Sequence, residues 1–450
     1  MSEIAKKSSA YSGRIPFYLL ILYLAFEYGR IHAALAPLKS LHLPFLTSMG
    51  LVLFLIFERP ILNDKQTKWF IALVILMVIH IPFAVNNHWA FVYTRMVFTY
   101  LVIHLAITKY VVSYKMLRKM IFLWLICGMF LCIQGVLHGG EVKGSAFFSD
   151  NNDFSLAMNM FLGISFFRFV ENPKKHISVL AIIGLFLFSI LVSFSRGGFV
   201  GLCVMTVFIW MKSRRKMLGV VLVIGMIVFV SQMAPSRYWD RMKTITDLEE
   251  TEEYKGSSGG RIYYWERAWE MFLDHPLFGV GPGNFNWNVS QYEDEGGLRG
   301  KTRGGRASHS LYFTLIPELG LVGCFFFGMM LFTNYKTLSG IRKKFKEKKR
   351  TQASHGRAEN EGSEGLKGKD SETLQVMNMM YYDSLGIYVA LIGVLASGAF
   401  LSVLYYPHFW ILSSMTTSIG RLREELENKE LALDNEGVGV LKGHRFGLAE

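Results

Sequence analysis

The sequence predicts an all-α, polytopic integral membrane protein with about twelve transmembrane helices and one large extracytoplasmic loop. Hydrophobic residues make up 51% of the 450-residue chain, and they gather in blocks of the ~20 residues that cross a bilayer as a helix. Lysine and arginine crowd into alternate connections between these blocks. One polar stretch, rich in arginine and tryptophan, is much longer than a simple connection between two helices.

The apolar blocks define the expected transmembrane segments. Backbone groups inside lipid must be hydrogen-bonded within the protein, so each block is expected to be a helix rather than a loop. The second, eighth and last blocks are short enough to be tilted or only partly buried in lipid. The twelve blocks cover about residues 15–35, 42–57, 69–85, 89–107, 116–137, 152–169, 177–195, 197–211, 217–234, 309–334, 379–404 and 406–419.

The distribution of positive charge orients these helices. Cytoplasmic connections carry an excess of lysine and arginine, so we expect the basic connections on the inside, together with both termini. The net charge of +13 is then explained by topology, and we expect no nucleic-acid partner. The basic connections contain Lys6–Lys7, Lys65–Lys68, Lys115–Lys119, Lys174–Lys175 and Lys212–Lys216.

This topology divides the chain into membrane and aqueous parts. The stretch that follows the tenth helix has no apolar periodicity, and we expect a solvated linker whose basic end contacts anionic lipid headgroups. The parts are a cytoplasmic tail (1–14), helices one to nine (15–234), an extracytoplasmic loop with an interfacial helix (235–308), the tenth helix (309–334), a basic cytoplasmic linker (336–376), the last two helices (379–419) and a cytoplasmic tail (420–450).

The extracytoplasmic loop contains a predicted amphipathic helix. From Ile262 through Trp265, Trp269 and Phe272, apolar residues recur at spacings of three and four, which gives one apolar helical face. A helix with two tryptophans on it suits the membrane interface. Pro276 ends this pattern, and the glycines that follow it are expected to form tight turns. They are not a dinucleotide fingerprint, because no buried strand precedes them.

Several ionisable or polar residues share one depth, in the outer part of their helices. A charge at membrane depth costs roughly 2.5–3.5 kcal/mol or more, so these groups are expected to face one another or a polar cavity that opens outward. The alternatives are a structural ion pair for the first two residues and ordinary packing for single histidines. The residues are Glu27, Arg30, His32, His80, Arg95, Asn152, Asp153 and Arg196; His104 lies toward the inside.

Arg196 differs from the other members of this group. The run Ser193-Phe-Ser-Arg-Gly-Gly198 places its guanidinium at the end of a helix, where glycines permit close approach of the backbone. A planar fork of donors suits bidentate recognition of phosphate. From the residues alone, phosphate binding and a purely structural role are equally supported.

An ordered set of motifs over about 145–410 resembles a known family. The chain is similar to the O-antigen ligase and polymerase superfamily of bacterial membrane glycosyltransferases, and within it to the O-glycosylation ligases found with exosortase systems. Each motif is weak alone, and their order and spacing carry the resemblance. The motifs are Ser149–Phe154, Ser193–Gly198, Tyr238–Ile245, Gly260–Phe285, Ser308–Phe313, Glu318–Gly320 and Gly398–Ser402.

The resemblance implies transfer of a glycan from undecaprenyl diphosphate to an acceptor hydroxyl, with inversion and without a metal or cofactor. The reaction would take place on the outer face of the bacterial cytoplasmic membrane. Arg196 and Arg261 match arginines thought to hold the diphosphate, and His309 matches the histidine proposed to activate the acceptor. Asn152 and Asp153 lie in a matching turn and are expected to contact substrate, although Asn151 stands where close relatives usually have proline.

The residues themselves fit this chemistry. Two guanidiniums in a poorly solvated site could stabilise a departing diphosphate, and a neutral imidazole could accept the proton of the acceptor. The acceptor could be a lipid, a protein or a polysaccharide. A polysaccharide polymerase, which joins lipid-linked repeat units, is a close alternative. A lipid or glycan transporter is a further one, which the lack of an internal repeat weakens.

Overall fold

The regular secondary structure of the described part of the chain is all helical, as predicted, and this part contains no β-strand. The computed structural model describes residues 14–30, 41–142, 147–148, 150–212, 217, 259–293, 306–355 and 364–445. The ninth predicted segment, except position 217, lies outside these ranges. The part of the outer loop that precedes Gly259 and the residue His32 also lie outside them.

The helices follow the predicted order of the apolar blocks. In chain order they are α2 (Arg14–Leu24), the π-helical η1 (Ala25–Gly29), α5 (Leu43–Glu58), α6 (Lys65–His80), α7 (Asn87–Tyr110), α8 (Tyr114–Leu137), α9 (Asn151–Glu171), α10 (Val179–Val192), α11 (Arg196–Lys212), α14 (Gly259–Asp274), α15 (Phe285–Asn288), η3 (Val289–Gln291), α16 (Tyr312–His355), α17 (Glu364–Gly398) and α18 (Pro407–Arg445).

Five of the described helices are long and apolar enough to cross a membrane. They are α7, α8, α9 and the apolar parts of α16 and α17, and α5 and α10 are shorter apolar helices. The protein is therefore a polytopic membrane protein, while the total of twelve helices stays a prediction. Helix α9 lies at the centre, packed against α8, α10, α11 and α17. Of the 18-residue apolar stretch of α9, 94% is buried inside the bundle.

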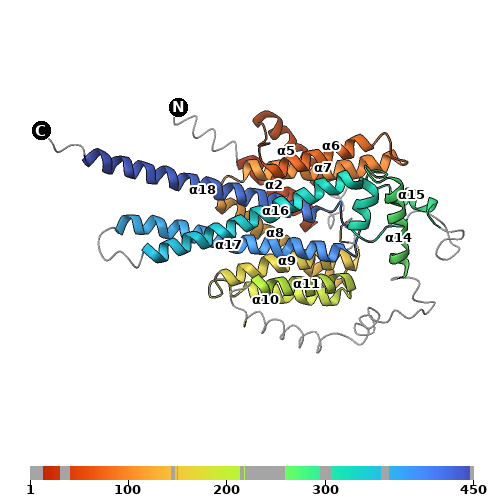
Figure 1. Cartoon of the computed structure of the whole chain (residues 1–450). Helices are drawn as coiled ribbons and strands as arrows, with labels where there is room; N and C mark the ends of the chain where they lie inside the picture. The colour runs from red at the N-terminus through yellow and green to blue at the C-terminus, as the bar shows by residue number, and fades with distance from the viewer. Residues whose placement is uncertain are drawn as a thin grey trace.

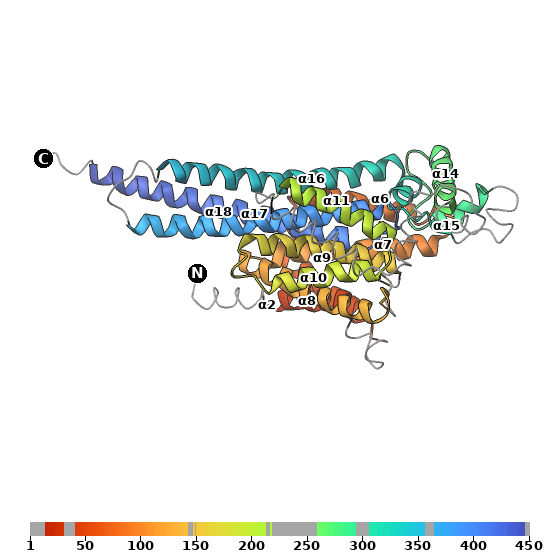
Figure 2. The same cartoon turned by 90° about the horizontal axis from the view of Figure 1, so that it is seen from below.

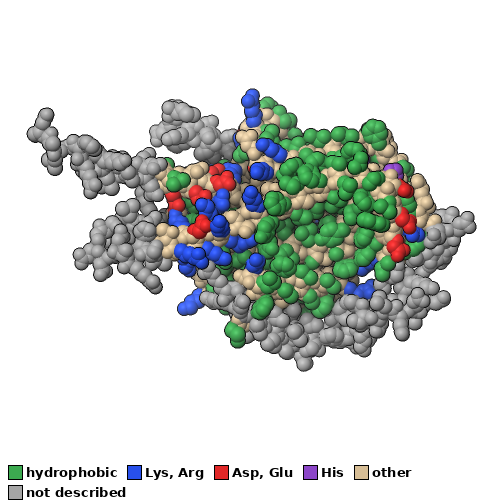
Figure 3. Space-filling view, viewed as in Figure 1, with side chains coloured by type: hydrophobic (Ala, Val, Ile, Leu, Met, Phe, Trp, Pro, Cys, Tyr) green, Lys and Arg blue, Asp and Glu red, His purple; other side chains and the backbone are tan. Residues whose placement is uncertain are grey.

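The two ends of the bundle differ in shape and in charge. Figures 1 and 2 show α16, α17 and α18 extending together beyond one end, while α14 and α15 lie at the opposite end. On the face drawn in Figure 3, apolar side chains cover the bundle, and lysines and arginines gather toward the end with the helical extension. This pattern is the one expected where basic residues mark the cytoplasmic side.

The predicted solvated linker is largely helical, a feature that the sequence did not indicate, and its place in the cytoplasm stays a prediction. Helix α16 continues to His355 and α17 begins at Glu364, so only the short stretch between them lies outside the described residues. Contacts between the extended helices explain the difference. Lys348 forms an ion pair with Glu430 of α18, the rings of Phe345 and Tyr381 lie 4.9 Å apart, and α18 itself continues through most of the predicted tail.

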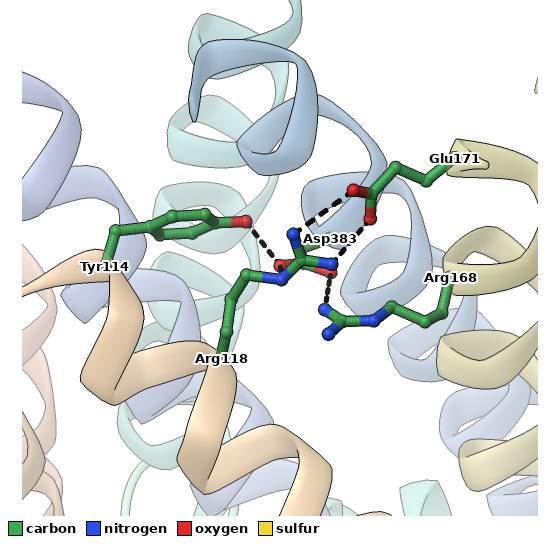
Figure 4. Close-up of polar contacts among 5 residues, drawn as sticks. All are labelled: Tyr114, Arg118, Arg168, Glu171 and Asp383. Carbon is green, nitrogen blue, oxygen red and sulfur yellow. Dashed lines mark hydrogen bonds and ion pairs between the residues drawn. The ribbon is translucent and has the colours of Figure 1, made fainter. Parts of the chain in front are cut away.

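A largely buried ionic cluster joins α8, α9 and α17 (Figure 4). Arg118 of α8 donates two hydrogen bonds to Glu171 of α9, at 3.1 and 2.6 Å. Asp383 of α17 lies 3.7 Å from Arg118 and 3.7 Å from Arg168, and it also accepts a hydrogen bond from Tyr114. Because buried charges are tolerated only when paired, the cluster fixes α8, α9 and α17 relative to one another.

Candidate active site

A chain of hydrogen bonds links the start of α9 to the start of α11. The Asp150 carboxylate accepts from the backbone N–H of Asn152 at 2.6 Å and from its Nδ2 at 2.7 Å. The Oδ1 of Asn152 in turn accepts from Ser195 Oγ at 2.7 Å. Ser195 Oγ accepts from the backbone N–H of Gly198 at 2.9 Å. The turn before α9 therefore fixes the helix end that carries Arg196.

Glycines on α11 allow this helix end to lie close against its neighbours. A Cβ at Gly198 would lie 2.1 Å from the Oγ of Ser155 on α9, and one at Gly201 would lie 1.9 Å from the Oγ of Ser397 on α17. Asn159 Nδ2 adds a hydrogen bond to the Gly198 carbonyl at 2.8 Å. The sequence predicted this close approach, and the packing holds the backbone beside Arg196 in one place.

Asn152 and Asp153 are neighbours in the sequence but have different surroundings. Asn152 is half-buried and bonded to Ser195 and Asp150. Asp153 is buried and accepts a hydrogen bond from Tyr406 at 2.9 Å. Both side chains therefore have structural partners, and their contact with substrate stays a prediction.

Arg261 lies in the first turn of α14, near Arg196. Burial lowers the pKa of the Arg261 guanidinium, the charge of Arg196 lowers it further, and Asp150 opposes both effects. An arginine stays protonated at physiological pH under such shifts because its reference pKa is so high. Two positive charges and one carboxylate, which are far apart in the sequence, thus share one electrostatic environment.

His309 projects from a tightly held turn just before α16. Its own side chain is exposed, whereas Ser308 and Ser310 on either side of it are buried. Trp265 of α14 donates from Nε1 to the Ser308 carbonyl at 2.9 Å, and its ring stacks on Phe313 with centroids 5.1 Å apart. The backbone of His309 is left-handed, with φ of 49°. The tryptophan predicted to face the membrane interface therefore also positions the histidine turn.

The charges around His309 favour its neutral form. Although the ring is accessible, the protein atoms around it partly desolvate it, and this lowers its pKa from the usual value. Arg261 and Arg306 lower the pKa further, while Asp150 raises it. A neutral imidazole is the form that can accept a proton. Arg261, Asp150 and His309 are thus brought together by the fold, and Arg196 joins them through its interaction with Arg261.

Glu318 has a structural role that sequence reasoning did not assign. Its carboxylate accepts from the backbone N–H of Gly283 at 2.7 Å and of Phe285 at 3.0 Å, and from Tyr405 Oη. The tight turns predicted for this glycine segment are present, with positive φ at Gly279, Gly281 and Gly283. Glu318 thus joins α16 to the segment that follows α14.

The irregularity of α16 lies at Gly320, shortly after Pro317, which is itself within the helix. Gly320 has φ of 60° and ψ of −165°. Backbone groups freed by this break pair with the segment after α14, since Leu321 N–H donates to the Pro276 carbonyl at 2.8 Å and Gly281 N–H to the Glu318 carbonyl at 2.9 Å. The break is therefore satisfied by hydrogen bonds and orients the outer end of α16.

Replacing Glu318 is expected to destabilise the protein strongly. In Glu318→Ala, the buried Phe285 N–H and Tyr405 hydroxyl and the half-buried Gly283 N–H lose their acceptor. Each such loss at a buried donor costs about 1–3 kcal/mol. The detergent-solubilised variant should therefore unfold at a clearly lower temperature, measured by intrinsic fluorescence. Glu293→Ala is the matched control, because Glu293 is half-buried and accepts only from Tyr264 among the hydrogen bonds described. An unfolding temperature of Glu318→Ala equal to that of the control would contradict this role.

The other polar residues of the predicted outer group do not join this site through any described contact. His80 is buried and its Nδ1 bonds to the Leu76 carbonyl at 2.9 Å, and Arg95 is exposed on α7. Glu27 is buried in η1. His104, which was predicted to lie toward the inside and not in this group, lies between Thr67 and Ser414, at 2.8 and 3.1 Å. The shared outward-opening cavity therefore stays a prediction.

No cluster of histidine, cysteine and carboxylate groups suitable for a metal ion occurs within the described ranges. The residues gathered at the site are instead three arginines, one histidine and one carboxylate. Such a set recognises an anion through charge-assisted hydrogen bonds. The structure adds Asp150, Trp265 and Arg306 to the residues predicted for this site. Arg306 lies shortly before His309 in the sequence, and Asp150 lies within the motif Ser149–Phe154. The contact of Trp265 with the Ser308 carbonyl depends on the tertiary fold.

Comparison with protein families supports the resemblance found in the sequence. Residues 180–328 match the family model described as O-Antigen ligase. The matched range contains Arg196, Arg261 and His309, whereas Asn152 and Asp153 precede it. No curated protein matches the chain. The resemblance to the O-antigen ligase and polymerase superfamily is thus confirmed, and the link to exosortase systems stays a prediction.

Proposed function

We propose that this bacterial multi-pass membrane protein, a member of the O-antigen ligase and polymerase superfamily, transfers a glycan from undecaprenyl diphosphate to an acceptor hydroxyl. The reaction takes place on the outer face of the cytoplasmic membrane. One observation supports the proposal. Arg196 of α11 acts electrostatically on Arg261 of α14, and Arg261 acts on His309, while the hydrogen bond from Trp265 to the Ser308 carbonyl holds α14 against the turn that carries His309.

The two arginines stabilise the leaving group in this mechanism. As the bond between the anomeric carbon and the phosphate oxygen breaks, its electron pair stays on the diphosphate and negative charge accumulates there. Guanidiniums fixed in a partly desolvated site stabilise such charge most in the transition state. The half-buried positions of Arg196 and Arg261 support this role, and the reaction then needs no metal.

His309 activates the acceptor. Its neutral imidazole takes the proton of the acceptor hydroxyl while the oxygen attacks the anomeric carbon from the face opposite to the diphosphate, which inverts the configuration. The proton ends on the imidazole and the glycan ends on the acceptor. The accessible position of His309 between two buried serines supports this assignment, since a general base must be reachable by its substrate.

Reconstitution tests this function directly. The purified protein is placed in liposomes with undecaprenyl-diphosphate-linked glycan and with candidate lipid, peptide or polysaccharide acceptors, and product masses are measured. A single glycan added to an acceptor supports a ligase, and a ladder of repeat units on undecaprenyl diphosphate supports a polymerase. Movement of the donor across the bilayer without a new glycosidic bond would contradict both and favour a transporter.

The proposed topology predicts which loops are accessible from outside. Gln291 of η3, which follows α15, and Gln352, near the end of α16, are both exposed. Helix α15 and the extended end of α16 lie at opposite ends of the bundle in Figure 1. Each glutamine can be replaced singly by cysteine in a variant in which the four native cysteines are serine. In intact spheroplasts, an impermeant maleimide should label the Gln291→Cys variant, whereas the Gln352→Cys variant should react only after permeabilisation. The reverse pattern would place Arg261 and His309 on the cytoplasmic side.

A further inference from the structure

The turn before α9 carries a carboxylate that the proposed mechanism does not use. Asp150 is the N-cap of α9 and its side chain is exposed, beside an arginine pair that is proposed to bind an anion. A negative charge there opposes donor binding through simple repulsion. Capping alone does not explain a carboxylate at this position, because an asparagine or serine caps a helix equally well.

A chain of hydrogen bonds and an electrostatic effect suggest the reason for this carboxylate. On one side, Asp150 holds Asn152, which holds Ser195 and the start of α11 beside Arg196. On the other side, its charge acts on both Arg261 and His309. Asp150 therefore connects both halves of the site, and it does so as a carboxylate from a third element, the start of α9.

We propose that Asp150 is a positioning residue for glycan transfer, which holds Arg196 in place through Asn152 and Ser195 and supplies the negative charge that His309 needs when it accepts a proton. This inference rests on the proposed function. When His309 becomes an imidazolium, it faces Arg261 from α14 and Arg306 from its own segment. Without Asp150, this positive charge would form beside two arginines, and no other carboxylate in the described ranges is seen to act on it. The groups that face Asp150 itself include Asp153 on α9 and Tyr406 before α18.

The two roles can be separated by substitution. Asp150→Asn keeps an oxygen that can cap α9 and accept from Asn152, but it removes the charge. Ser195→Ala leaves the charge of Asp150 in place but breaks the hydrogen-bond chain to α11. Asp64→Asn is the matched control, because Asp64 is the N-cap of α6 and accepts from the Thr67 N–H at 2.8 Å, outside the candidate site.

The charge role is tested without relying on catalysis. In purified protein with ¹³C-labelled histidine, with the His309 signal assigned from the His309→Asn variant, Asp150→Asn should lower the titration midpoint of His309 by about 0.5–1 pH unit. It should also tighten the binding of inorganic pyrophosphate a few-fold, measured by calorimetry. Unchanged His309 titration and pyrophosphate affinity would overturn the charge role, whatever the protein catalyses.

The kinetic consequences distinguish the two substitutions. In the transfer assay, Asp150→Asn should lower kcat about 3- to 10-fold without raising KM for the donor, because the proton acceptor is weakened while Arg196 stays in place. Ser195→Ala should raise KM for the lipid-diphosphate donor and leave the His309 titration unchanged. If Ser195→Ala has parental kinetics, the hydrogen-bond chain does not position Arg196. If no variant or parent transfers glycan, the proposed function fails, while the titration still decides the role of Asp150.

Discussion

His309→Ala is expected to insert normally, to bind the lipid-diphosphate donor and to transfer glycan about 10²–10⁴-fold more slowly, the usual contribution of a general base. The turn that carries His309 is held by its neighbours. Trp265 bonds to the Ser308 carbonyl at 2.9 Å, and the Leu311 N–H donates to the Gly398 carbonyl at 2.7 Å. Removing an exposed ring should therefore leave the turn in place.

Two further variants distinguish a base from an anchor. His309→Gln keeps hydrogen bonding but cannot take up the proton, so it should be impaired to a similar degree. His309→Asn has the same defect and suits the left-handed backbone of this position, with φ of 49°, because asparagine adopts that conformation more readily than most residues. Parental transfer rates in the asparagine or glutamine variant would show that His309 only anchors the start of α16. Donor binding, measured separately, serves as the control for folding.

The parts of the fold that depend on local pattern could be predicted from the sequence. Apolar blocks of sufficient length become helices because lipid leaves backbone groups no other partner, and α7, α8 and α9 follow their predicted blocks closely. The spacing of Ile262, Trp265 and Trp269 predicted α14 because a helical face repeats every three to four residues. The position of Arg196 at a helix end could likewise be predicted from the run Ser193–Gly198.

The parts of the fold that depend on contacts between distant segments could not be predicted from the sequence. The extended ends of α16 and α17 have no apolar periodicity that predicts a helix, and their helical state depends on contacts such as Phe345 with Tyr381. The partners of Glu318 lie in a glycine segment whose path is set by the break at Gly320. Asp150 could be placed in a matching motif, but its electrostatic contact with Arg261 and His309 appears only when α9, α14 and the turn before α16 are assembled.

Arg196→Lys and Arg261→Lys are each expected to lower transfer about 10- to 100-fold although the charge is kept. An ammonium is a point charge, whereas a guanidinium donates two parallel hydrogen bonds to a phosphate. The loss of one such charge-assisted bond is worth about 1.5–3 kcal/mol, which corresponds to this range of rates. Because charge accumulates on the diphosphate as it departs, kcat should fall more than the affinity for the donor.

The matched control for both variants is Arg267→Lys. Arg267 lies on α14, the helix that carries Arg261, but it pairs with Glu270 at 2.6 Å and lies over the ring of Tyr263. A guanidinium engaged in this way has no role in holding the donor, so Arg267→Lys should transfer glycan at nearly the parental rate. If Arg196→Lys and Arg261→Lys are as active as this control, with normal membrane insertion, the two arginines do not clamp the diphosphate. A defect confined to Arg261→Lys would instead leave Arg196 as a structural residue, fixed by the start of α11 and by the hydrogen bonds from Asn152 to Ser195.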